Sequence, residues 1–210
     1  KVSKKVLSDI SVSSLNTLLK KGILVEEKEE VYRFHKDIQK EKNNYILTES
    51  QKKAIETIYQ STSFQTYLLH GVTGSGKTEV YMSIIEEALK LGKETIMLVP
   101  EISLTPQVVG KFISRFGDVV AVLHSKLSDT ERYDEYRKIT TGEAKIVIGT
   151  RSAIFVPFNN IGVIIIDEEH TSSYKQENHP RYNAKDIAIL RSKYHKCPVV
   201  MGSATPSLES

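Results

Sequence analysis

The sequence has little cysteine and no long apolar run. Cys197 is the only cysteine among 210 residues, which excludes a disulfide framework and a cysteine-based zinc site built within this chain. A reducing cytoplasm is the simplest compartment for such a composition. No apolar stretch approaches the ~20 residues that cross a bilayer, and the polar, lysine-rich start lacks the pattern of a signal peptide. We therefore expect a cytoplasmic protein without a membrane partner.

The excess of charge is also small. The formal net charge is +3 and the pI is 8.7, a balance that suits a nucleic-acid partner and equally suits a solvated, slightly basic surface. The length of 210 residues and the apolar fraction of 40% allow one domain with a sizeable core plus a small appendage. Because the chain starts at Lys1 rather than Met and stops at Ser210 just after a motif-like stretch, we expect a piece of a longer protein.

A glycine-rich stretch over 71–78 organises the rest of the sequence. It matches the phosphate-binding pattern G-x-x-x-x-G-K-[ST] at every fixed position. The apolar run before it predicts a short buried strand over 66–70, and the periodicity after it predicts a helix over 79–90. Backbone N–H groups of such a loop point at phosphate oxygens, and the helix N-terminus adds partial positive charge. The residues that we expect to hold a nucleotide are Gly71, Thr73, Gly74, Ser75, Gly76, Lys77 and Thr78.

Two side chains of this loop have expected roles of their own. Lys77 would reach the β- and γ-phosphates, and the Thr78 hydroxyl would hold Mg²⁺. The alternative is a glycine-rich turn without a ligand, which the strand–loop–helix context disfavours.

Acidic residues follow a second apolar run. The run over 163–166 precedes Asp167, Glu168, Glu169 and His170, and in a parallel α/β sheet the carboxyl ends of the strands form the edge where ligands collect. We expect Asp167 to hold Mg²⁺ and Glu168 to orient or deprotonate the attacking water. His170 either senses the γ-phosphate or caps the turn. The alternative for the whole stretch is a solvated acidic turn at a strand end.

Gln51 has two interpretations, and the residues leave both open. Thr48 followed by Gln51 fits a helix capping box. A glutamine just ahead of a phosphate loop can also pair with the edge of adenine, because its amide offers both a donor and an acceptor.

Strand and helix patterns alternate after the phosphate loop. Continuous Val and Ile runs are typical of strands buried on both faces, so the sequence predicts a mostly parallel sheet covered by helices, an α/β fold. The expected strands are 94–99, 119–123, 144–148, 162–166 and 198–201. The expected helices are 107–116, 128–140 with Ser128 and Glu131 in a capping box, and 183–195.

The first part of the chain, 1–44, predicts a small winged-helix-like domain with a linker, and 45–210 forms the main domain. The second helix of such a module often contacts DNA. Lysines in that helix favour the role, the Glu-rich hairpin opposes it, and a spacer or protein-contact role is the alternative. The expected elements are helices over 4–10 and 13–22, the second closed by Gly22, a hairpin over 25–34 and a polar linker over 36–44.

Polar loops at the expected strand ends suit contact with a sugar–phosphate backbone. Three of them carry hydroxyls and backbone amides, although each alone is more often an ordinary loop. A fourth loop, over 172–182, alternates aromatic with basic residues and could stack unpaired bases. Its alternative is a surface loop with two tyrosines anchored in the core. The residues that we expect to contact DNA are Pro100, Glu101, Thr150, Arg151, Tyr174, Lys175, Arg181, Tyr182, Ser203 and Thr205.

The order of these motifs resembles the first lobe of superfamily 2 helicases. That series corresponds here to Gln51, the glycine-rich stretch over 71–78, Pro100-Glu101, Gly149-Thr150-Arg151, the acids from Asp167 to His170 and Ser203-Ala204-Thr205. Over 47–207, the chain resembles the PriA family of primosomal replication-restart helicases. The stretches that carry this resemblance are LLHGVTGSGKTEVY, LVPEISLTPQ, HSKLSD, GTRSA, DEEHTSSYKQENHPRYNA and GSATPS.

The resemblance implies a RecA-like motor lobe that binds ATP and Mg²⁺, preceded by a winged helix. Gln51 would read adenine, and the loop over 171–182 would couple DNA to hydrolysis. The parent would be a bacterial cytoplasmic monomer that moves 3′ to 5′ on single strands and stalled forks. Its partners would be a single-stranded-DNA-binding protein and primosome loader proteins. Another superfamily 2 DNA translocase, or an ATP-dependent DNA-binding module without unwinding, is the alternative.

Three parts of that family have no counterpart in this sequence. They are the domain that binds a DNA 3′ end, the second motor lobe with its arginine fingers, and the zinc-binding cysteines, so zinc is expected only in the second lobe. Because an arginine finger is worth ~10³–10⁵ in rate, we expect this chain alone to bind nucleotide weakly and to hydrolyse it very slowly.

Overall fold

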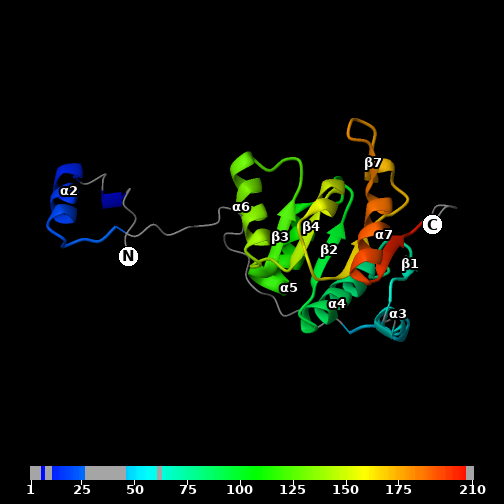
Figure 1. Cartoon of the computed structure of the whole chain (residues 1–210). Coiled ribbons are helices and arrows are strands. Elements are labelled where there is room, and N and C mark those ends of the chain that lie inside the picture. The colour runs from blue at the N-terminus through cyan, green and yellow to red at the C-terminus, as the bar shows by residue number, and fades with distance from the viewer. Residues whose placement is uncertain (1–5, 8–10, 27–45, 61–62, 207–210) are drawn as a thin grey trace. The chain divides into compact units, whose positions relative to one another are not determined.

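The computed structural model describes residues 6–7, 11–26, 46–60 and 63–206. The chain divides into two compact units, Lys1–Tyr32 and Arg33–Ser210, which are coloured along the chain in Figure 1. Each unit is described by itself.

The first unit contains the helix α2, Val12–Lys20. It begins where the Ser11 hydroxyl accepts a hydrogen bond from the backbone N–H of Ser14 at 3.3 Å. Gly22 follows the helix with a left-handed φ of 69°, which confirms the predicted glycine closure. Most of the expected helix over 4–10 lies outside the described residues, as do the hairpin beyond Glu26 and the linker over 36–44. The winged-helix domain and its boundary at residue 44 stay predictions.

The second unit is built on a six-stranded parallel sheet with the order β1-β8-β5-β2-β4-β3. The strands are β1 Thr66–His70, β2 Glu94–Leu98, β3 Val120–Leu123, β4 Ile146–Gly149, β5 Ile161–Ile166 and β8 Val199–Ser203. The helices are α3 Glu49–Gln60, α4 Lys77–Lys90, α5 Pro106–Phe116, α6 Asp129–Thr140 and α7 Ala184–His195. The parallel sheet and its helices confirm the predicted α/β fold.

Short elements complete this unit, and the sequence pattern did not predict them. Three 3₁₀ turns occur at η1 Gly117–Val119, η2 Arg151–Phe155 and η3 Ser172–Tyr174. Two short strands, β6 Lys175–Gln176 and β7 Tyr182–Asn183, pair antiparallel, so much of the expected loop over 172–182 is a hairpin. Among the described residues, no helix combines the length and the apolarity that crossing a membrane requires.

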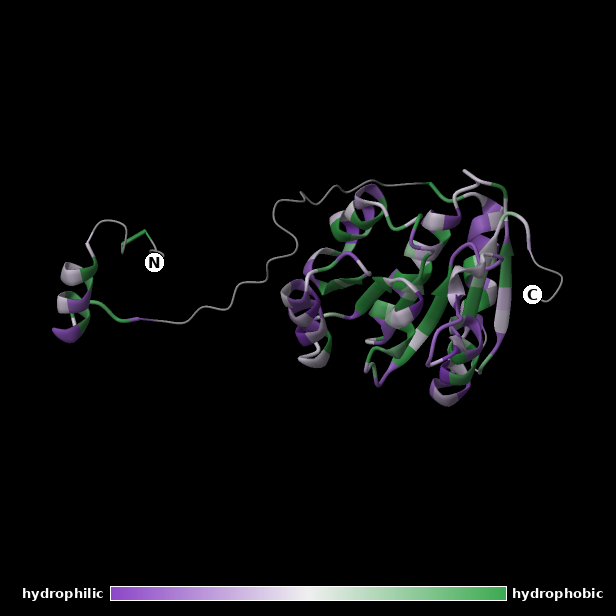
Figure 2. Cartoon of the chain, turned by 90° about the horizontal axis from the view of Figure 1, so that it is seen from above, coloured by the Kyte–Doolittle hydropathy of each residue, from purple (hydrophilic) through white to green (hydrophobic). Residues whose placement is uncertain are grey.

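Helices cover both faces of the sheet and bury a separate core on each. In β5, Ile164 and Ile166 pack with the core that contains α7 and α6 side chains. The alternate residues Val163 and Ile165 pack with side chains of α4, α5 and α3. Figure 2 shows the apolar strands among helices that mix hydrophilic and hydrophobic residues. A strand buried on both faces explains why the sequence of β5 is a continuous apolar run.

The strand β1 differs from its prediction as a buried strand. It lies at an edge of the sheet and pairs with β8, and its side chains alternate between exposed and half-buried. Leu68 is 43% exposed, whereas Tyr67 and Leu69 pack against the α4 side of the sheet. The apolar run did not distinguish a strand covered on one face from one covered on both.

The strand order brings three strand ends together. From β1 the chain passes through α4 to β2, and β8 and β5 later occupy the two places between them. His70 pairs with Ser203 of β8, and Ile166 of β5 pairs with Met201. Because all six strands are parallel, the residues that follow β1, β5 and β8 meet at the same edge.

A buried carboxylate protects the opposite edge of the sheet. Glu135 of α6 is fully buried, and its Oε2 accepts a hydrogen bond from the backbone N–H of Val122 in β3 at 2.7 Å. Its Oε1 accepts from Lys138 Nζ at 2.8 Å. Since β3 is an edge strand, this side chain takes the place of a neighbouring strand as hydrogen-bond partner.

We predict that Glu135→Ala lowers the free energy of unfolding by about 3–5 kcal/mol, because it removes a buried carboxylate that pairs with the Lys138 ammonium and accepts a hydrogen bond from the Val122 N–H. Glu135→Gln should cost less, since its amide oxygen can still accept from Val122. Urea unfolding measures both. The control is Asp129→Ala, at an exposed carboxylate of the same helix, which should cost less than about 1 kcal/mol. A Glu135→Ala variant as stable as this control contradicts the prediction.

Candidate nucleotide-binding site

The glycine-rich loop joins β1 to α4, as the sequence predicted, and the helix begins at Lys77. Gly74 and Gly76 both have a φ of 83°, a conformation that favours glycine. At Gly76, a Cβ atom would also lie 2.5 Å from Gln51 Nε2. The backbone conformation therefore favours glycine at the start of α4, and a larger residue there would displace the end of the Gln51 side chain.

Lys77 folds back over this loop toward the acidic strand end. Its Nζ donates a hydrogen bond to Gly71 O at 2.7 Å and lies 3.4 Å from Val72 O. The same nitrogen is 3.8 Å from Glu168 Oε1, and the Lys77 side chain is only 10% exposed. The two regions that the sequence singled out separately thus meet at one place.

Asp167 is held from several sides at the end of β5. Its Oδ1 accepts a hydrogen bond from the Tyr81 hydroxyl of α4 at 2.9 Å, and its backbone N–H donates to Leu98 O at 2.9 Å. Burial raises the pKa of the Asp167 carboxyl above its usual value, and the neighbouring Glu168 adds to the rise. The Tyr81 hydrogen bond and Lys77 oppose it. A carboxylate in this setting favours a nearby cation.

The donor set fits Mg²⁺ bound together with a nucleotide. Mg²⁺ takes oxygen ligands, typically one or two carboxylates plus phosphates and water. Here Asp167 supplies a carboxylate, and Thr78 places a hydroxyl in the first turn of α4. The described part of the chain contains no group of three or more His, Cys, Asp or Glu side chains that could hold a metal by itself. Phosphate oxygens would therefore be needed to complete the coordination.

The next three residues of the acidic turn point to different partners. Glu168 has a positive φ of 46°, which is uncommon outside glycine, and its Oε2 is 3.6 Å from His170 Nδ1. Glu169 is fully buried, and its Oε2 accepts from Lys185 Nζ at 3.1 Å. His170 Nδ1 is 2.8 Å from the Ser203 hydroxyl. Glu168 and His170 thus face the phosphate loop and β8, whereas Glu169 has an internal ion pair.

Ser203 does not fit its predicted contact with DNA. Its side chain is fully buried, and its hydroxyl accepts from the backbone N–H of Thr205 at 3.1 Å besides contacting His170. It therefore joins the end of β8 to the acidic turn. Thr205 is exposed, and its predicted contact with DNA stays open.

Gln51 forms the predicted capping box. Its Oε1 accepts from the Thr48 backbone N–H at 2.9 Å, and the Thr48 hydroxyl accepts from the Gln51 N–H at 3.3 Å. Its Nε2 also donates to Ser75 O at 3.1 Å, so the amide links the start of α3 to the phosphate loop. One N–H and one lone pair of the amide have no part in these bonds, and the role of Gln51 in reading adenine stays a prediction.

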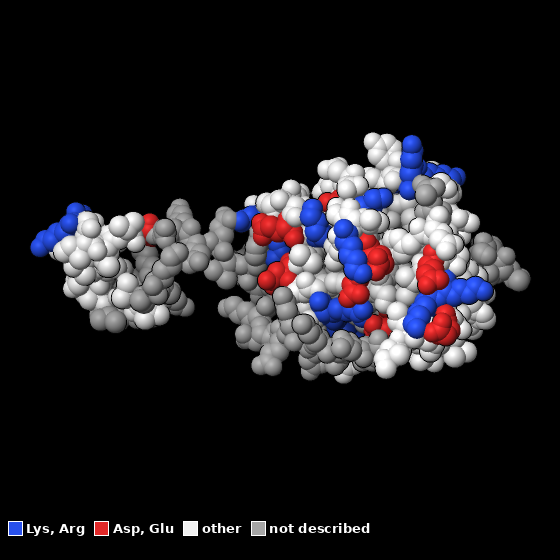
Figure 3. Space-filling model, turned by 90° about the horizontal axis from the view of Figure 1, so that it is seen from below, with Lys and Arg blue, Asp and Glu red and all other residues white. Residues whose placement is uncertain are grey.

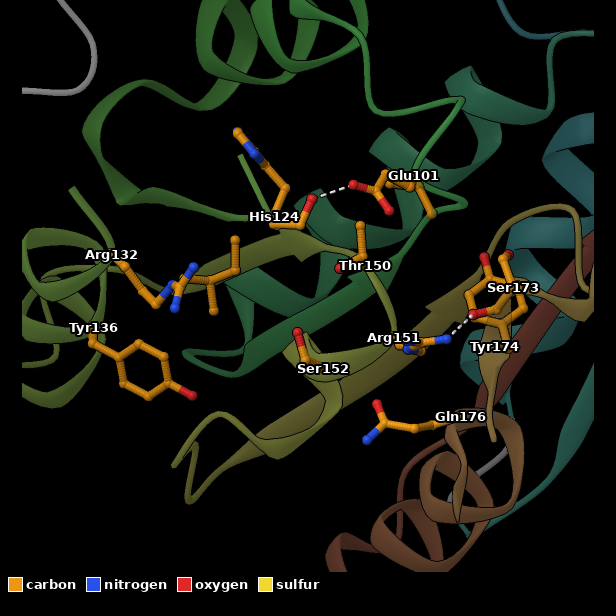
Figure 4. Close-up of a pocket in the computed structure, with 13 residues that line it drawn as sticks. Glu101, His124, Arg132, Tyr136, Thr150, Arg151, Ser152, Ser173, Tyr174 and Gln176 are labelled. Carbon is orange, nitrogen blue, oxygen red and sulfur yellow. Dashed lines mark hydrogen bonds between the residues drawn. The ribbon is translucent and has the colours of Figure 1, made fainter. Parts of the chain in front are cut away.

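A cavity of about 450 Å³ lies beyond the ends of β2, β3 and β4 (Figure 4). It gathers four of the predicted DNA-contacting residues, Glu101, Thr150, Arg151 and Tyr174, while Pro100 is buried beside it. Sequence reasoning missed Arg132 and Tyr136 of α6, although their spacing of four residues places them on one helix face. The lining residues are Val99, Glu101, Leu123, His124, Ser125, Arg132, Tyr136, Thr150, Arg151, Ser152, Ser173, Tyr174 and Gln176.

The two ends of this cavity are held by side-chain contacts. Arg151 Nη1 donates to Lys175 O at 3.1 Å and lies 3.5 Å from Ser173 O. Glu101 accepts a hydrogen bond from the Ser125 hydroxyl. Arg151 therefore fixes the start of the hairpin rather than extending freely into solvent.

The tyrosines of the hairpin region behave differently from the predicted base-stacking pair. Tyr174 is 1% exposed, and its hydroxyl donates to Leu98 O at 3.2 Å and to Asp167 O. Its ring therefore cannot stack a base in this structure, which corrects the prediction in favour of a core anchor. Tyr182 is half-buried and packs edge-on against Phe155, with ring centroids 4.9 Å apart. Lys175 and Arg181 are exposed, and their contact with DNA stays a prediction.

The surface charge of this unit is mixed. In the view of Figure 3, Lys and Arg side chains alternate with Asp and Glu. This face therefore presents no field of a single sign, in keeping with the small net charge of +3.

His124 couples the cavity wall to pH. Its Nδ1 accepts a hydrogen bond from the backbone N–H of Lys126 at 3.2 Å, which requires an unprotonated nitrogen. Burial lowers the pKa of His124, the carboxylates of Glu101 and Glu131 oppose this shift, and Lys126 adds to it.

We predict that acid weakens the fold through His124. Because its folded-state pKa is lowered, its contribution to stability is present above about pH 6.5 and is lost as pH falls through the folded pKa. Asparagine could accept the same hydrogen bond and does not titrate. The parent should therefore lose more of its melting temperature than His124→Asn when the pH is lowered from about 7 to about 5. The melting temperature of the variant minus that of the parent should increase toward acid. A difference that is constant or falls toward acid contradicts this.

Comparisons with known proteins identify a family for this chain. The family model described as "DEAD/DEAH box helicase" matches residues 48–210. Replication restart protein PriA of Bacillus subtilis is 56% identical over 208 residues, which cover 97% of this chain and 26% of that protein. The Synechocystis protein of the same name is 48% identical over 202 residues, which cover 95% of this chain and 24% of that protein. The chain thus spans about a quarter of these relatives.

A solved structure extends the similarity to the fold. The structure titled "Structure of RecG bound to three-way DNA junction" superposes with a TM-score of 0.59 and 29% identity. The match covers 78% of this chain and 22% of that one. The parallel sheet and the phosphate loop, with the acidic turn two strands away, form a RecA-like lobe of a kind that binds nucleotide with Mg²⁺. The chain belongs to the DEAD/DEAH box helicase family, and within it resembles the PriA proteins.

Proposed function

We propose that this chain is the ATP-binding motor lobe of a DNA helicase that acts in replication restart. The observation that carries the proposal is the 3.8 Å approach of Lys77 Nζ to Glu168 Oε1. It brings a phosphate-loop lysine and an acidic strand end to one point on the sheet edge. The 56% identity to the Bacillus subtilis PriA protein supports replication restart as the process.

In the proposed reaction, the γ-phosphate of ATP is transferred to water. Backbone N–H groups of the loop from Gly71 to Gly76 hold the phosphates, and Lys77 moves from its carbonyl partners onto the β- and γ-phosphate oxygens. This chain would hold Mg²⁺ through Thr78 and Asp167. The bound ion would supply positive charge that offsets the charge of the phosphates.

Glu168 is the proposed general base of this scheme. It is half-buried and lies beside Lys77, so it faces the place where the γ-phosphate would sit. It would orient the attacking water and take its proton. His170, which contacts Glu168 and Ser203, would sense the presence of the γ-phosphate. Gln51 would contact adenine through the amide N–H and the oxygen lone pair that its bonds to Thr48 and Ser75 do not use.

DNA is the proposed substrate of the motor, bound along the strand ends beyond the nucleotide. Thr150 and Arg151 line the cavity there. Lys175, Arg181 and Thr205 belong to the other motifs for which DNA contact was predicted, and all three are exposed. For the whole protein we propose 3′-to-5′ movement coupled to ATP hydrolysis at forks and single strands. The further proposals are a winged helix in 1–44, a zinc site in a second lobe, a bacterial cytoplasmic monomer, and contacts with a single-stranded-DNA-binding protein and primosome loaders.

A second candidate is a superfamily 2 translocase of another process. The 29% identity to the structure titled "RecG bound to three-way DNA junction" favours it as the alternative. An ATP-dependent DNA-binding module would instead show no ATP-dependent strand separation in the full-length protein. The restart assignment predicts that the full-length protein separates strands at model forks and supports loading of a replicative helicase onto them.

We predict opposite nucleotide-binding results for two variants of the full-length protein. Lys77→Ala should lose both nucleotide binding and DNA-stimulated ATP hydrolysis, because it removes the phosphate contact. Glu168→Gln should keep binding and lose about 100-fold or more of its turnover, because an amide cannot accept the proton. Equilibrium binding of a fluorescent ATP analogue and a phosphate-release assay measure the two effects.

The control is Glu56→Gln, an exposed carboxylate on α3, which should leave both measurements unchanged. The chain of 210 residues, assayed alone, should turn over ATP at least ~10³-fold more slowly than the full-length protein, because the arginine fingers are expected in a second lobe. DNA-stimulated turnover that survives Lys77→Ala or Glu168→Gln rejects the roles given to these residues.

A further inference from the structure

Tyr81 has a contact that the proposed chemistry does not use. It belongs to α4, one turn after Lys77, and is fully buried. Its hydroxyl donates to Asp167 Oδ1 at 2.9 Å. A tyrosine that only filled the core could direct its hydroxyl to a backbone carbonyl, as Tyr59 does toward Ile84 O on the same helix. Tyr81 instead directs it to the carboxylate at the end of β5.

The neighbouring strand makes space for this contact. Gly202 of β8 lies between the end of β5 and the phosphate loop in the sheet order. A Cβ atom at Gly202 would overlap the Tyr81 hydroxyl oxygen and would lie 2.8 Å from Tyr81 Cζ. The backbone N–H of Glu169 donates to Gly202 O at 3.0 Å, which fixes the acidic turn against the same residue. The glycine of the Gly202-Ser203-Ala204-Thr205 stretch thus accommodates the Tyr81 side chain.

The hydrogen bond also settles how the carboxylate is presented. The terminal torsion of an aspartate is broad, so an unrestrained carboxylate samples many orientations. Tyr81 engages Oδ1, and the carboxylate also accepts a hydrogen bond from the Glu168 backbone N–H. These two bonds restrain the orientation of the carboxylate, and the lone pairs that they leave can coordinate a cation. Hydrogen bonds of this kind to a metal-ligating carboxylate typically account for 10–100-fold in metal affinity.

We propose that Tyr81 is a positioning residue that orients Asp167 for Mg²⁺, with Gly202 providing the space that it needs. The inference rests on the proposed function, since it assumes a Mg²⁺–nucleotide complex at this site. If Tyr81 has this role, one helix positions both parts of the site. Helix α4 carries Lys77 and Thr78 in its first turn and Tyr81 in the next. One rigid helix therefore sets both the phosphate cradle and the orientation of the metal carboxylate.

The test compares nucleotide binding with and without the metal. In the full-length protein, Tyr81→Phe should weaken binding of a non-hydrolysable ATP analogue about 10-fold in Mg²⁺ and leave it unchanged in excess EDTA. Tyr59→Phe is the matched control, because it removes the same atom from a phenol that contacts the same helix away from Asp167. It should lower the melting temperature about as much as Tyr81→Phe and preserve binding in both conditions.

Gly202→Ala adds an independent arm. Alone, it should push the Tyr81 hydroxyl from Asp167 and reproduce the Mg²⁺-dependent loss. Added to Tyr81→Phe, it should cost less than it does alone, because the atom that it overlaps is gone. Equal losses for Tyr81→Phe with and without Mg²⁺, or strictly multiplicative effects of the two changes, overturn the inference while leaving the proposed function intact. A parent protein that binds the analogue with no dependence on Mg²⁺ overturns both.

Discussion

The placement of β8 between β1 and β5 is the constraint on which the site depends. It separates the phosphate loop from the acidic turn by one strand, a spacing that the Lys77 side chain can cross to lie 3.8 Å from Glu168. It also allows Tyr81 to reach Asp167 across Gly202. With β5 directly beside β1 there would be no intervening glycine, and with another strand inserted the lysine would not reach. Because the strands are parallel, the loops that follow β1, β5 and β8 meet at one edge of the sheet. The sheet itself therefore brings these three loops together.

The charged side chains at this edge suit a ligand that carries both a cation and anionic phosphates. Asp167 and Glu168 are adjacent and half-buried, and the Lys77 ammonium lies 3.8 Å from Glu168. Burial raises the pKa of Asp167, with a further contribution from Glu168. A Mg²⁺–triphosphate complex would place a cation by the carboxylates and phosphate oxygens by the lysine, so it offsets both the repulsion and the desolvation. Without ligand, the repulsion and desolvation of these carboxylates lower the stability of the fold. The bound ligand relieves both, which strengthens its binding.

Much of this arrangement was predictable from the sequence. Glycines at fixed spacing predicted the phosphate loop, and alternating Val/Ile runs and helices predicted the parallel sheet. The capping box of Ser128 and Glu131 at the start of α6 is present as expected. These features depend on local chemistry: left-handed backbone at Gly74 and Gly76, hydrogen bonds over one helical turn, and burial of consecutive apolar residues.

The features that were not predictable depend on contacts between distant segments. The edge position of β1 is set by strand order, which an apolar run does not encode. Tyr174 looked like a base-stacking residue because it alternates with basic residues, but its hydroxyl finds Leu98 O and Asp167 O in the core. Tyr81 occupied an apolar position of a helix pattern, and its partner lies 86 residues away. For each of these residues, the type alone fits both a core role and a functional one, and the fold decides between them.

The central claim is that one Mg²⁺–triphosphate lies between the glycine-rich loop and the acidic turn. A crystal structure of the full-length protein with Mn²⁺ and a non-hydrolysable ATP analogue, with anomalous scattering to locate the metal, tests it most directly. We expect the metal to lie about 2.0–2.2 Å from the Thr78 hydroxyl oxygen and from β- and γ-phosphate oxygens. Asp167 should contact it directly or through one water, and Lys77 Nζ should lie on the phosphates. A metal bound elsewhere, or a triphosphate with Lys77 and Asp167 on unconnected sides, would contradict the account.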